Sequence, residues 1–304
     1  MYYVVYALLY LLSLLPMRLL YLLSDSLALL LYYVVRYRRG VVLTNLEIAF
    51  PEKTREEHLQ IAKKFYRNFV DNFIETIKLL SASQQWIKER LIIDNPELFD
   101  RFYKEGRKCQ LHLGHTFNWE LANAAMPLLV EYPFLVVYMP IENKSFDRLF
   151  LHLRSRTGTT LLPATSMSRA ILPYRNTRYL LTLVADQAPG NWGNAYWMNF
   201  FSRPTGFLKP PERGARIADI PVVFARLYKS SRGHYHAEVS LGADHPAQLP
   251  EGELTRRYVR FMEESIRKEP SGWLWSHKRW KGQWKAEYSK MWVDENKCPP
   301  EEKS

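Results

Sequence analysis

From about residue 108 onward, short apolar runs alternate with stretches of helical pattern, and this alternation restricts the chain to few folds. The helical patterns cover 119–130, 143–155 and 254–267. The apolar runs are CQLHL (109–113), PFLVVYMP (133–140), TTLLPA (159–164), YLLTLVAD (179–186) and IPVVFARLY (220–228). Short strands separated by helices are typical of a sheet that helices cover on both faces. We therefore predict an α/β fold with a mixed, mostly parallel central sheet, in which HYHAEVSL (234–241) forms a hairpin with 222–229.

A strong amphipathic helix is expected ahead of this region. Thr54 and Glu57 have the spacing of a capping box, in which the hydroxyl and the carboxylate each satisfy a free amide at the start of a helix. Apolar residues then recur at four-residue spacing, at Ile61, Phe65, Phe69, Phe73 and Ile77. This period places them on one helical face, so we expect a helix to about Leu80 that packs on the core.

The first forty residues differ from the rest of the chain. The first thirty-five carry only Arg18 and Asp25 as charged residues, and Pro16 separates two apolar stretches, 1–15 and 19–35. Each stretch is shorter than the roughly 20 residues that cross a bilayer. A single tilted span, a helical pair lying in the interface, and an apolar cap on the domain all remain open. We predict membrane attachment.

A basic collar follows the apolar segment, at Arg36, Arg38 and Arg39. Positive residues beside a membrane segment tend to stay in the cytoplasm, so we expect the bulk of the protein on the cytoplasmic side of the membrane. The expected organisation is a membrane-attachment segment over 1–40, one catalytic domain over 41–290, and a frayed tail over 291–304.

Charge and cysteine content narrow the possible partners and the compartment. The 304 residues hold 42 Lys plus Arg against 31 Asp plus Glu, a formal net charge of +11. A surface this basic favours a polyanionic partner, such as nucleic acid, anionic lipid or an acidic carrier protein. Cys109 and Cys298 form no disulfide framework and no C-x-x-C pair, which fits a reducing compartment.

The sequence HTFNWE (115–120) lies where the apolar run CQLHLG ends and a helical pattern begins. In open α/β sheets, functional side chains gather at the carboxyl ends of strands. We expect His115 on the strand-to-helix turn and Glu120 in the first helical turn, close enough to meet. An imidazole has an ordinary pKa of about 6.5 and accepts a proton near neutral pH, and a carboxylate on its other nitrogen fixes its tautomer. With no serine or cysteine nucleophile in HTFNWE, the pair is suited to activating a substrate hydroxyl.

These residues carry a resemblance to a known family. HTFNWE, preceded by LG, resembles the H-x-x-x-x-D/E box of the lysophospholipid acyltransferase superfamily. More narrowly, it is similar to the HxGNWE form of lipid A biosynthesis (late, lauroyl/myristoyl) acyltransferases. Further segments match in order: NLEIAFPEKTREE, RSRTG, ADQAPG, NFFSRPTGFLKPPERGARIADIPVVF and GWLWSHKRWK. Together the similar segments span roughly residues 36–285.

The resemblance implies a membrane-associated acyltransferase that moves a fatty acyl chain from an acyl-carrier-protein thioester to a hydroxyl of a phosphorylated lipid A precursor. It would act at the cytoplasmic face of a cell inner membrane. It implies no cofactor and no metal, with acyl carrier protein or coenzyme A carrying the co-substrate thioester. His115 would be the general base and Glu120 its orienting partner. The implied substrate-binding residues are Arg154, Arg156, Gly158, Asp186, Gln187, Lys278 and Arg279. The apolar stretch AYWMNFF (195–201) could supply one wall of an acyl groove.

Two departures from the family pattern leave the acceptor open. Phe117 stands where HxGNWE has glycine, and FLKPPERGAR differs from the usual T-x-G-x-A-R-L-A run. A lysophospholipid, an amino-acid lipid or a sulfonolipid precursor would use the same pair of residues.

Other interpretations compete with catalysis. His112 lies close to His115 and Glu120, but on a strand His112 and His115 point to opposite faces, so we expect a buried, hydrogen-bonded His112 rather than a metal ligand. Tryptophans alternate with basic residues near the end of the chain, at Trp273, Trp275, Trp280, Trp284, Lys278, Arg279, Lys281 and Lys285. Such a stretch could bind single-stranded nucleic acid, but we favour a membrane-interface belt or core packing and expect no nucleic-acid partner.

Overall fold

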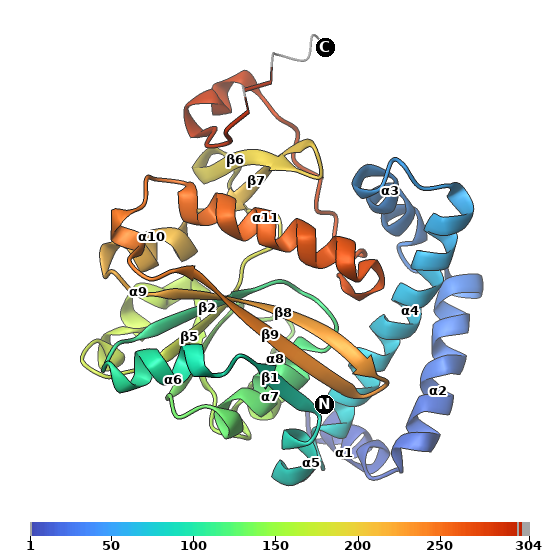
Figure 1. Ribbon diagram of the computed structural model, residues 1–304. Coiled ribbons are helices and arrows are strands. Elements are labelled where there is room, and N and C mark those ends of the chain that lie inside the picture. Colours follow the sequence, from blue (N-terminus) through green and yellow to red (C-terminus); the bar gives the residue numbers. More distant parts are fainter. Residues whose placement is uncertain (1, 297, 300–304) are drawn as a thin grey trace.

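The computed structural model describes residues 2–296 and 298–299 of the chain. Its centre is a seven-stranded sheet in the order β1-β9-β8-β2-β5-β3-β4. The strands are β1 (Leu91–Asp94), β2 (Cys109–Leu113), β3 (Phe134–Tyr138), β4 (Thr160–Pro163), β5 (Leu180–Val184), β8 (Val222–Ser231) and β9 (His234–Ala243). Neighbouring strands are parallel except for the antiparallel pair β8 and β9. The predicted α/β class, the mostly parallel sheet and the β8–β9 hairpin are confirmed (Figure 1).

Helices cover both faces of the sheet because the central strands are apolar on both sides. Every residue of β2 is buried, as expected for a parallel strand between two helical layers. Helices α6 (Glu97–Lys104) and α7 (Trp119–Leu129) pack on one face, whereas α11 (Glu253–Lys268) packs on the other. Helix α8 (Lys144–Ser155) follows β3 and precedes β4.

The expected amphipathic helix is α4 (Arg55–Lys78), and its capping box between Thr54 and Glu57 is formed. Its buried residues Ala62, Phe65 and Tyr66 join the core beneath α11. The short helices α3 (Arg39–Ala49) and α5 (Gln84–Lys88) flank it. Helix α4 therefore connects the N-terminal segment to the core of the chain.

The apolar N-terminal segment forms α1 (Tyr2–Ser13), α2 (Met17–Leu29) and the π-helical turn η1 (Leu30–Val35). Continuous helix from Met17 to Val35, 19 residues with a mean hydropathy of 1.5, is long and apolar enough to cross a membrane. This segment indicates membrane anchoring. Figure 1 shows α2 running beside α4 at the edge of the molecule.

A second, two-stranded sheet is made by β6 (Ala195–Phe200) and β7 (Arg203–Leu208), which the sequence did not predict. Its apolar residues Tyr196, Met198 and Phe200 are buried against α11 and the tryptophans of 273–280. Part of the expected frayed tail also belongs here: Val293 donates its amide to Trp197, and Asp294 accepts the amide of Asn199. Residues 297 and 300–304 of that tail lie outside the described residues.

Candidate active site

The turn 114–118 that follows β2 forms the centre of the site. A side chain at Gly114 would require the end of Met262 of α11 to move, because a Cβ there would overlap it and approach the Asp186 carboxylate. Asn118 ends the turn and caps α7, its side-chain oxygen accepting the amide of Leu121 at 2.9 Å. His115 therefore lies on the strand-to-helix turn and Glu120 in the first turn of α7, as the sequence predicts.

Phe117 points away from His115 and into the core. Its side chain is 2% exposed, and its ring packs near Tyr235 and beneath the Lys229 ammonium. The backbone at Phe117 has a φ of 44°, a conformation that glycine adopts with less strain. A Cβ built at Gly272 would overlap the Phe117 ring. Gly272 thus provides the space that the larger residue at 117 requires.

The carboxylate that holds His115 is Asp186. Its Oδ1 accepts the ring Nδ1 of His115 at 2.6 Å, and its Oδ2 accepts the backbone amide of His115 at 2.8 Å. The indole Nε1 of Trp273 donates to the same Oδ2 at 2.7 Å. Among the described residues, no hydrogen bond joins His115 to Glu120. The contact expected between those two side chains is therefore replaced by His115–Asp186.

The sheet order explains why Asp186 reaches His115. Strands β2 and β5 are parallel neighbours, with Leu113 opposite Val184. Continuing each strand by two residues brings His115 and Asp186 to the same sheet edge, where functional groups of open α/β sheets gather. Local sequence spacing carries no information about this neighbour relationship.

Asp186 is buried but remains ionised at neutral pH. Burial alone would raise its pKa, but the nearby His115 and the hydrogen bonds from His115 and Trp273 together lower the pKa of Asp186 below its usual value. A charged Asp186 requires the proton of His115 to sit on Nδ1. The lone pair of the neutral ring is then on Nε2, which can accept a proton from a substrate.

Nε2 of His115 faces Gln187, and Trp119 packs against the imidazole ring. The amide Nε2 of Gln187 lies 3.2 Å from Nε2 of His115, and the Trp119 ring stands edge-on to the imidazole with centroids 5.1 Å apart. Gln187 can donate a hydrogen bond to the lone pair that a substrate hydroxyl would use. The sequence-predicted residues His115, Asp186 and Gln187 are thus brought together.

Glu120 has a different partner, Arg154 of α8. The guanidinium Nε of Arg154 lies 2.9 Å from Oε2 and 3.2 Å from Oε1 of Glu120, and Nη2 also bonds Oε1. The exposed fractions of these side chains are 9% for Glu120 and 20% for Arg154. This forked ion pair ties the start of α7 to the end of α8. The Arg154 guanidinium, predicted to bind substrate, is therefore paired with the Glu120 carboxylate in this structure.

The remaining predicted binding residues lie in different environments. Arg156 and Gly158 are exposed after α8, and Arg156 donates to the carbonyl of Leu79. Lys278 is exposed, whereas Arg279 is fully buried and donates to the carbonyl of Gly206 at 2.9 Å. Burial lowers the pKa of Arg279 to about 10. Of this pair, Lys278 is therefore the one that solvent reaches.

His277 and Trp273 are site residues that sequence reasoning missed. The backbone amide of Ala188 donates to Nε2 of His277 at 3.1 Å, so the ring holds the segment that carries Asp186 and Gln187. Burial, followed by the charge of Arg279, lowers the pKa of His277 to about 4. Both residues belong to GWLWSHKRWK, and their place in that motif was the available signal.

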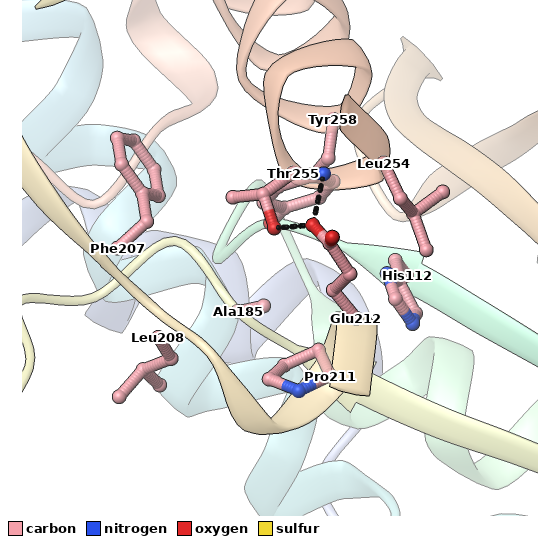
Figure 2. A pocket seen from close by; sticks show the side chains of 9 residues that line it. All are labelled: His112, Ala185, Phe207, Leu208, Pro211, Glu212, Leu254, Thr255 and Tyr258. Carbon is pink, nitrogen blue, oxygen red and sulfur yellow. Dashed lines mark hydrogen bonds between the residues drawn. The ribbon is translucent and has the colours of Figure 1, made fainter. Parts of the chain in front are cut away.

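A small cavity of about 10 Å³ lies between strand β2, the residue after β5, and the start of α11. Figure 2 shows its lining, in which Glu212 points at the start of α11 and bonds Thr255. The lining residues are His112, Ala185, Phe207, Leu208, Pro211, Glu212, Leu254, Thr255 and Tyr258. This volume is that of about one water molecule, so an acyl chain does not fit here. The stretch 195–201 is likewise packed: Tyr196, Trp197 and Met198 are at most 3% exposed.

His112 is buried and bonds the side chain of Gln110 at 2.9 Å, as expected for a buried, hydrogen-bonded histidine. Trp273 and Trp275 are fully buried, so their indoles are not free to stack on bases. Among the described residues, no cluster of three or more His, Cys, Asp or Glu side chains could hold a metal ion.

Two buried imidazoles predict how stability depends on pH. Burial lowers the pKa of His112 to about 3, and the pKa of His277 is about 4. Below about pH 6.5 the unfolded chain protonates both rings while the folded chain does not, so stability falls as pH falls from about 6.5 to about 4. We expect scanning fluorimetry in detergent to show this decline in melting temperature. The variant His112→Gln should make the decline shallower; an unchanged slope would contradict the assignment.

The chain is similar to a known protein family and to a named relative. The family described as "Bacterial lipid A biosynthesis acyltransferase" matches residues 1–282. A protein of Haemophilus influenzae, named "Lipid A biosynthesis acyltransferase", is 23% identical over 251 residues. That similarity covers 80% of this chain and 78% of the relative.

Proposed function

This chain belongs to the bacterial lipid A biosynthesis acyltransferase family, and we propose that it moves a fatty acyl chain from an acyl-carrier-protein thioester to a hydroxyl of a lipid A precursor, with His115 as general base. The observation that carries the proposed chemistry is the pair His115–Asp186. Nδ1 of the ring is held by a buried carboxylate at 2.6 Å, and Nε2 lies 3.2 Å from the side-chain amide of Gln187.

The proposed step needs one base and no protein nucleophile. Nε2 of His115 takes the proton of the acceptor hydroxyl as its oxygen attacks the thioester carbonyl. The tetrahedral intermediate then expels the thiolate, the C–S bond breaks, and the imidazolium returns the proton to sulfur. Asp186 stabilises the imidazolium and fixes the ring tautomer. The products are the acyl ester and the free thiol of the carrier.

Gln187 marks where the acceptor hydroxyl would bind. Its amide nitrogen lies 3.2 Å from Nε2 of His115, within the distance range expected of a general base and its substrate. The acceptor hydroxyl would displace this amide, which could then bind another substrate oxygen. In this proposal Asp186 orients the base, and Glu120 and Arg154 position the α7–α8 wall beside it.

The surroundings of the site favour an anionic acceptor and an acidic donor. Arg156 and Lys278 are exposed and are proposed to contact headgroup phosphate, while Gly158 gives the chain a turn with φ of 107° beside Arg156. The net charge of +11 suits a carrier protein that is acidic. The basic collar Arg36, Arg38 and Arg39 supports placement on the cytoplasmic face of the inner membrane.

The test is lipid mass spectrometry of cells that carry or lack the gene, complemented with wild type or with His115→Ala. We expect the deletion strain to accumulate lipid A lighter by one acyl chain, and wild type but not His115→Ala to restore it. A changed phospholipid or amino-lipid pool with normal lipid A would overturn the proposed acceptor. With purified protein, faster transfer from acyl-coenzyme A than from acyl carrier protein would overturn the proposed donor.

A further inference from the structure

Helix α2 has two distinct sides, which the hydropathy of the segment conceals. One side carries Tyr21, Ser24 and Asp25 and faces α4. The other side is exposed and apolar, and the exposed side of α1 and the end of η1 share this character. We call this surface the α1–α2 apolar face and define it by Val4, Leu8, Leu11, Leu22, Leu29 and Val34, which are 59–72% exposed.

Both ends of the long apolar helix are attached to the same helix of the catalytic domain. Before its first turn, the Lys78 ammonium donates to the carbonyls of Ser13 at 2.8 Å and Leu15 at 3.1 Å. After its last turn, the hydroxyl of Tyr66 donates to the carbonyl of Tyr37. Tyr66 and Lys78 are both in α4. Helix Met17–Val35 is therefore fixed to α4 at either end.

Charged groups fix the middle of the helix as well. The Asp25 carboxylate pairs with Arg67 at 3.0 Å and with Arg232 at 2.9 Å. Arg232 also pairs with the buried Asp71 of α4 at 2.6 Å, and Ser24 donates to Asp71 at 2.7 Å. An ion-pair network of this kind is costly to break, because a buried charge would lose its partner.

Helix α4 cannot lie in hydrocarbon. Charged side chains recur along its length, at Arg55, Glu56, Glu57, Lys63, Lys64, Arg67, Asp71, Glu75 and Lys78. Each ionised residue at the centre of a bilayer costs several kcal/mol in insertion, which rules out a span by this helix. A helix fixed at both ends and in the middle to α4 must therefore stay on the same side of the membrane as α4.

We propose that α1, α2 and η1 do not cross the membrane but lie along its surface, with the α1–α2 apolar face inserted among the lipids. Helix α1 is fixed to the domain in the same way: the Tyr6 ring meets His152 with centroids 5.5 Å apart, and Arg148 lies 4.3 Å over the Tyr2 ring. The occupant of the face is a phospholipid surface with anionic headgroups, because the exposed Arg18 and Arg36 border it.

This arrangement connects the membrane surface to the catalytic turn. Glu75 of α4 accepts the hydroxyl of Tyr21 in α2 at 2.9 Å and the side-chain amide of Asn118 at 2.8 Å. Asn118 caps α7 three residues after His115. A single buried carboxylate thus joins the lipid-facing helix to the turn that carries the proposed base, and it holds the site at a fixed distance from the membrane.

The depth of probes in the bilayer distinguishes helices that lie on the membrane surface from a helix that crosses it. Single cysteines at Leu8, Leu22 and Val34, each in a Cys298→Ser background with the buried Cys109 retained, are labelled with bimane. The protein is bound to vesicles of phosphatidylethanolamine and phosphatidylglycerol that contain doxyl-labelled lipid. We expect all three probes at a similar, shallow depth. A probe at Leu22 near the bilayer centre, with the Leu8 probe beyond it in the opposite leaflet, would overturn the proposal.

A second measurement tests the face itself. The double variant Leu8→Glu/Leu22→Glu should reduce partition into the same vesicles by about tenfold or more, because each leucine contributes buried apolar area. The matched control is Ile217→Glu, at an exposed apolar residue at the end of α10 (Pro210–Ile217) that is 76% exposed. Equal partition of the double variant and the control would contradict the proposal. Neither measurement reads acyl transfer, so failure here is separate from failure of the proposed function.

Discussion

The variant His115→Ala is expected to lower kcat for acyl transfer by about 10²–10⁴-fold while the protein stays folded, because the proposed proton acceptor is removed. The side chain lies at a partly open position, so its loss leaves the main core intact. Transfer is measured with purified protein and a radiolabelled acyl thioester. His112→Gln, in strand β2 just before the turn that carries His115, is the matched control, and we expect it to retain transfer.

The variant Asp186→Asn distinguishes the two candidate partner carboxylates. Asparagine keeps the size of Asp186 but cannot stabilise an imidazolium, so a fall in kcat of a similar order is expected. Glu120→Gln, compared at matched folded fraction, should change kcat far less than Asp186→Asn does. If Glu120→Gln abolishes transfer and Asp186→Asn does not, the assignment of Asp186 as the orienting residue is wrong.

Removing Glu120 from its ion pair with Arg154 should instead cost stability. In Glu120→Gln the Arg154 guanidinium, 20% exposed, loses its charged partner. Breaking one side of a largely buried ion pair typically destabilises by about 3–5 kcal/mol. Denaturant unfolding in detergent, followed by tryptophan fluorescence, measures the change in the free energy of unfolding.

An exposed ion pair provides the control for the predicted loss of stability in Glu120→Gln. Arg101 and Asp244 are 42% and 35% exposed, and exposed pairs contribute about 0–1 kcal/mol. Arg101→Gln should therefore leave the free energy of unfolding nearly unchanged. The double variant Glu120→Gln/Arg154→Met should recover part of the loss, because no unpaired charge remains. Equal effects of Glu120→Gln and Arg101→Gln would show that the Glu120–Arg154 pair has no structural role.

Apart from β9, which was predicted as the hairpin partner of β8, the strands that the sequence identified share one property. The runs that became β2, β3, β4, β5 and β8 are apolar and lie between helical patterns, so local periodicity was sufficient. Strand β1, LIID, is short and ends in a charge, and the β6–β7 hairpin contains Arg203 and Pro204. The sequence did not reveal these three strands.

For the site, too, the sequence identified some features and only the structure showed the others. His115, Asp186 and Gln187 were each identified from motifs in the chain, but their pairing was not. Glu120 was the obvious partner because it is near in sequence, yet its side chain pairs with Arg154 on α8. Trp273 and His277 reach the site from a segment more than 150 positions beyond His115.

By itself, the sequence determined the strand–helix alternation, the apolar N-terminal segment, and the residue types from which a base and its partner could be made. The reason is that periodicity and side-chain chemistry are local properties. The tertiary structure alone decided which carboxylate meets His115, because that depends on β5 lying beside β2. It also decided that α2 is fixed along α4, because the ion pairs of Asp25 join residues that are far apart in the chain.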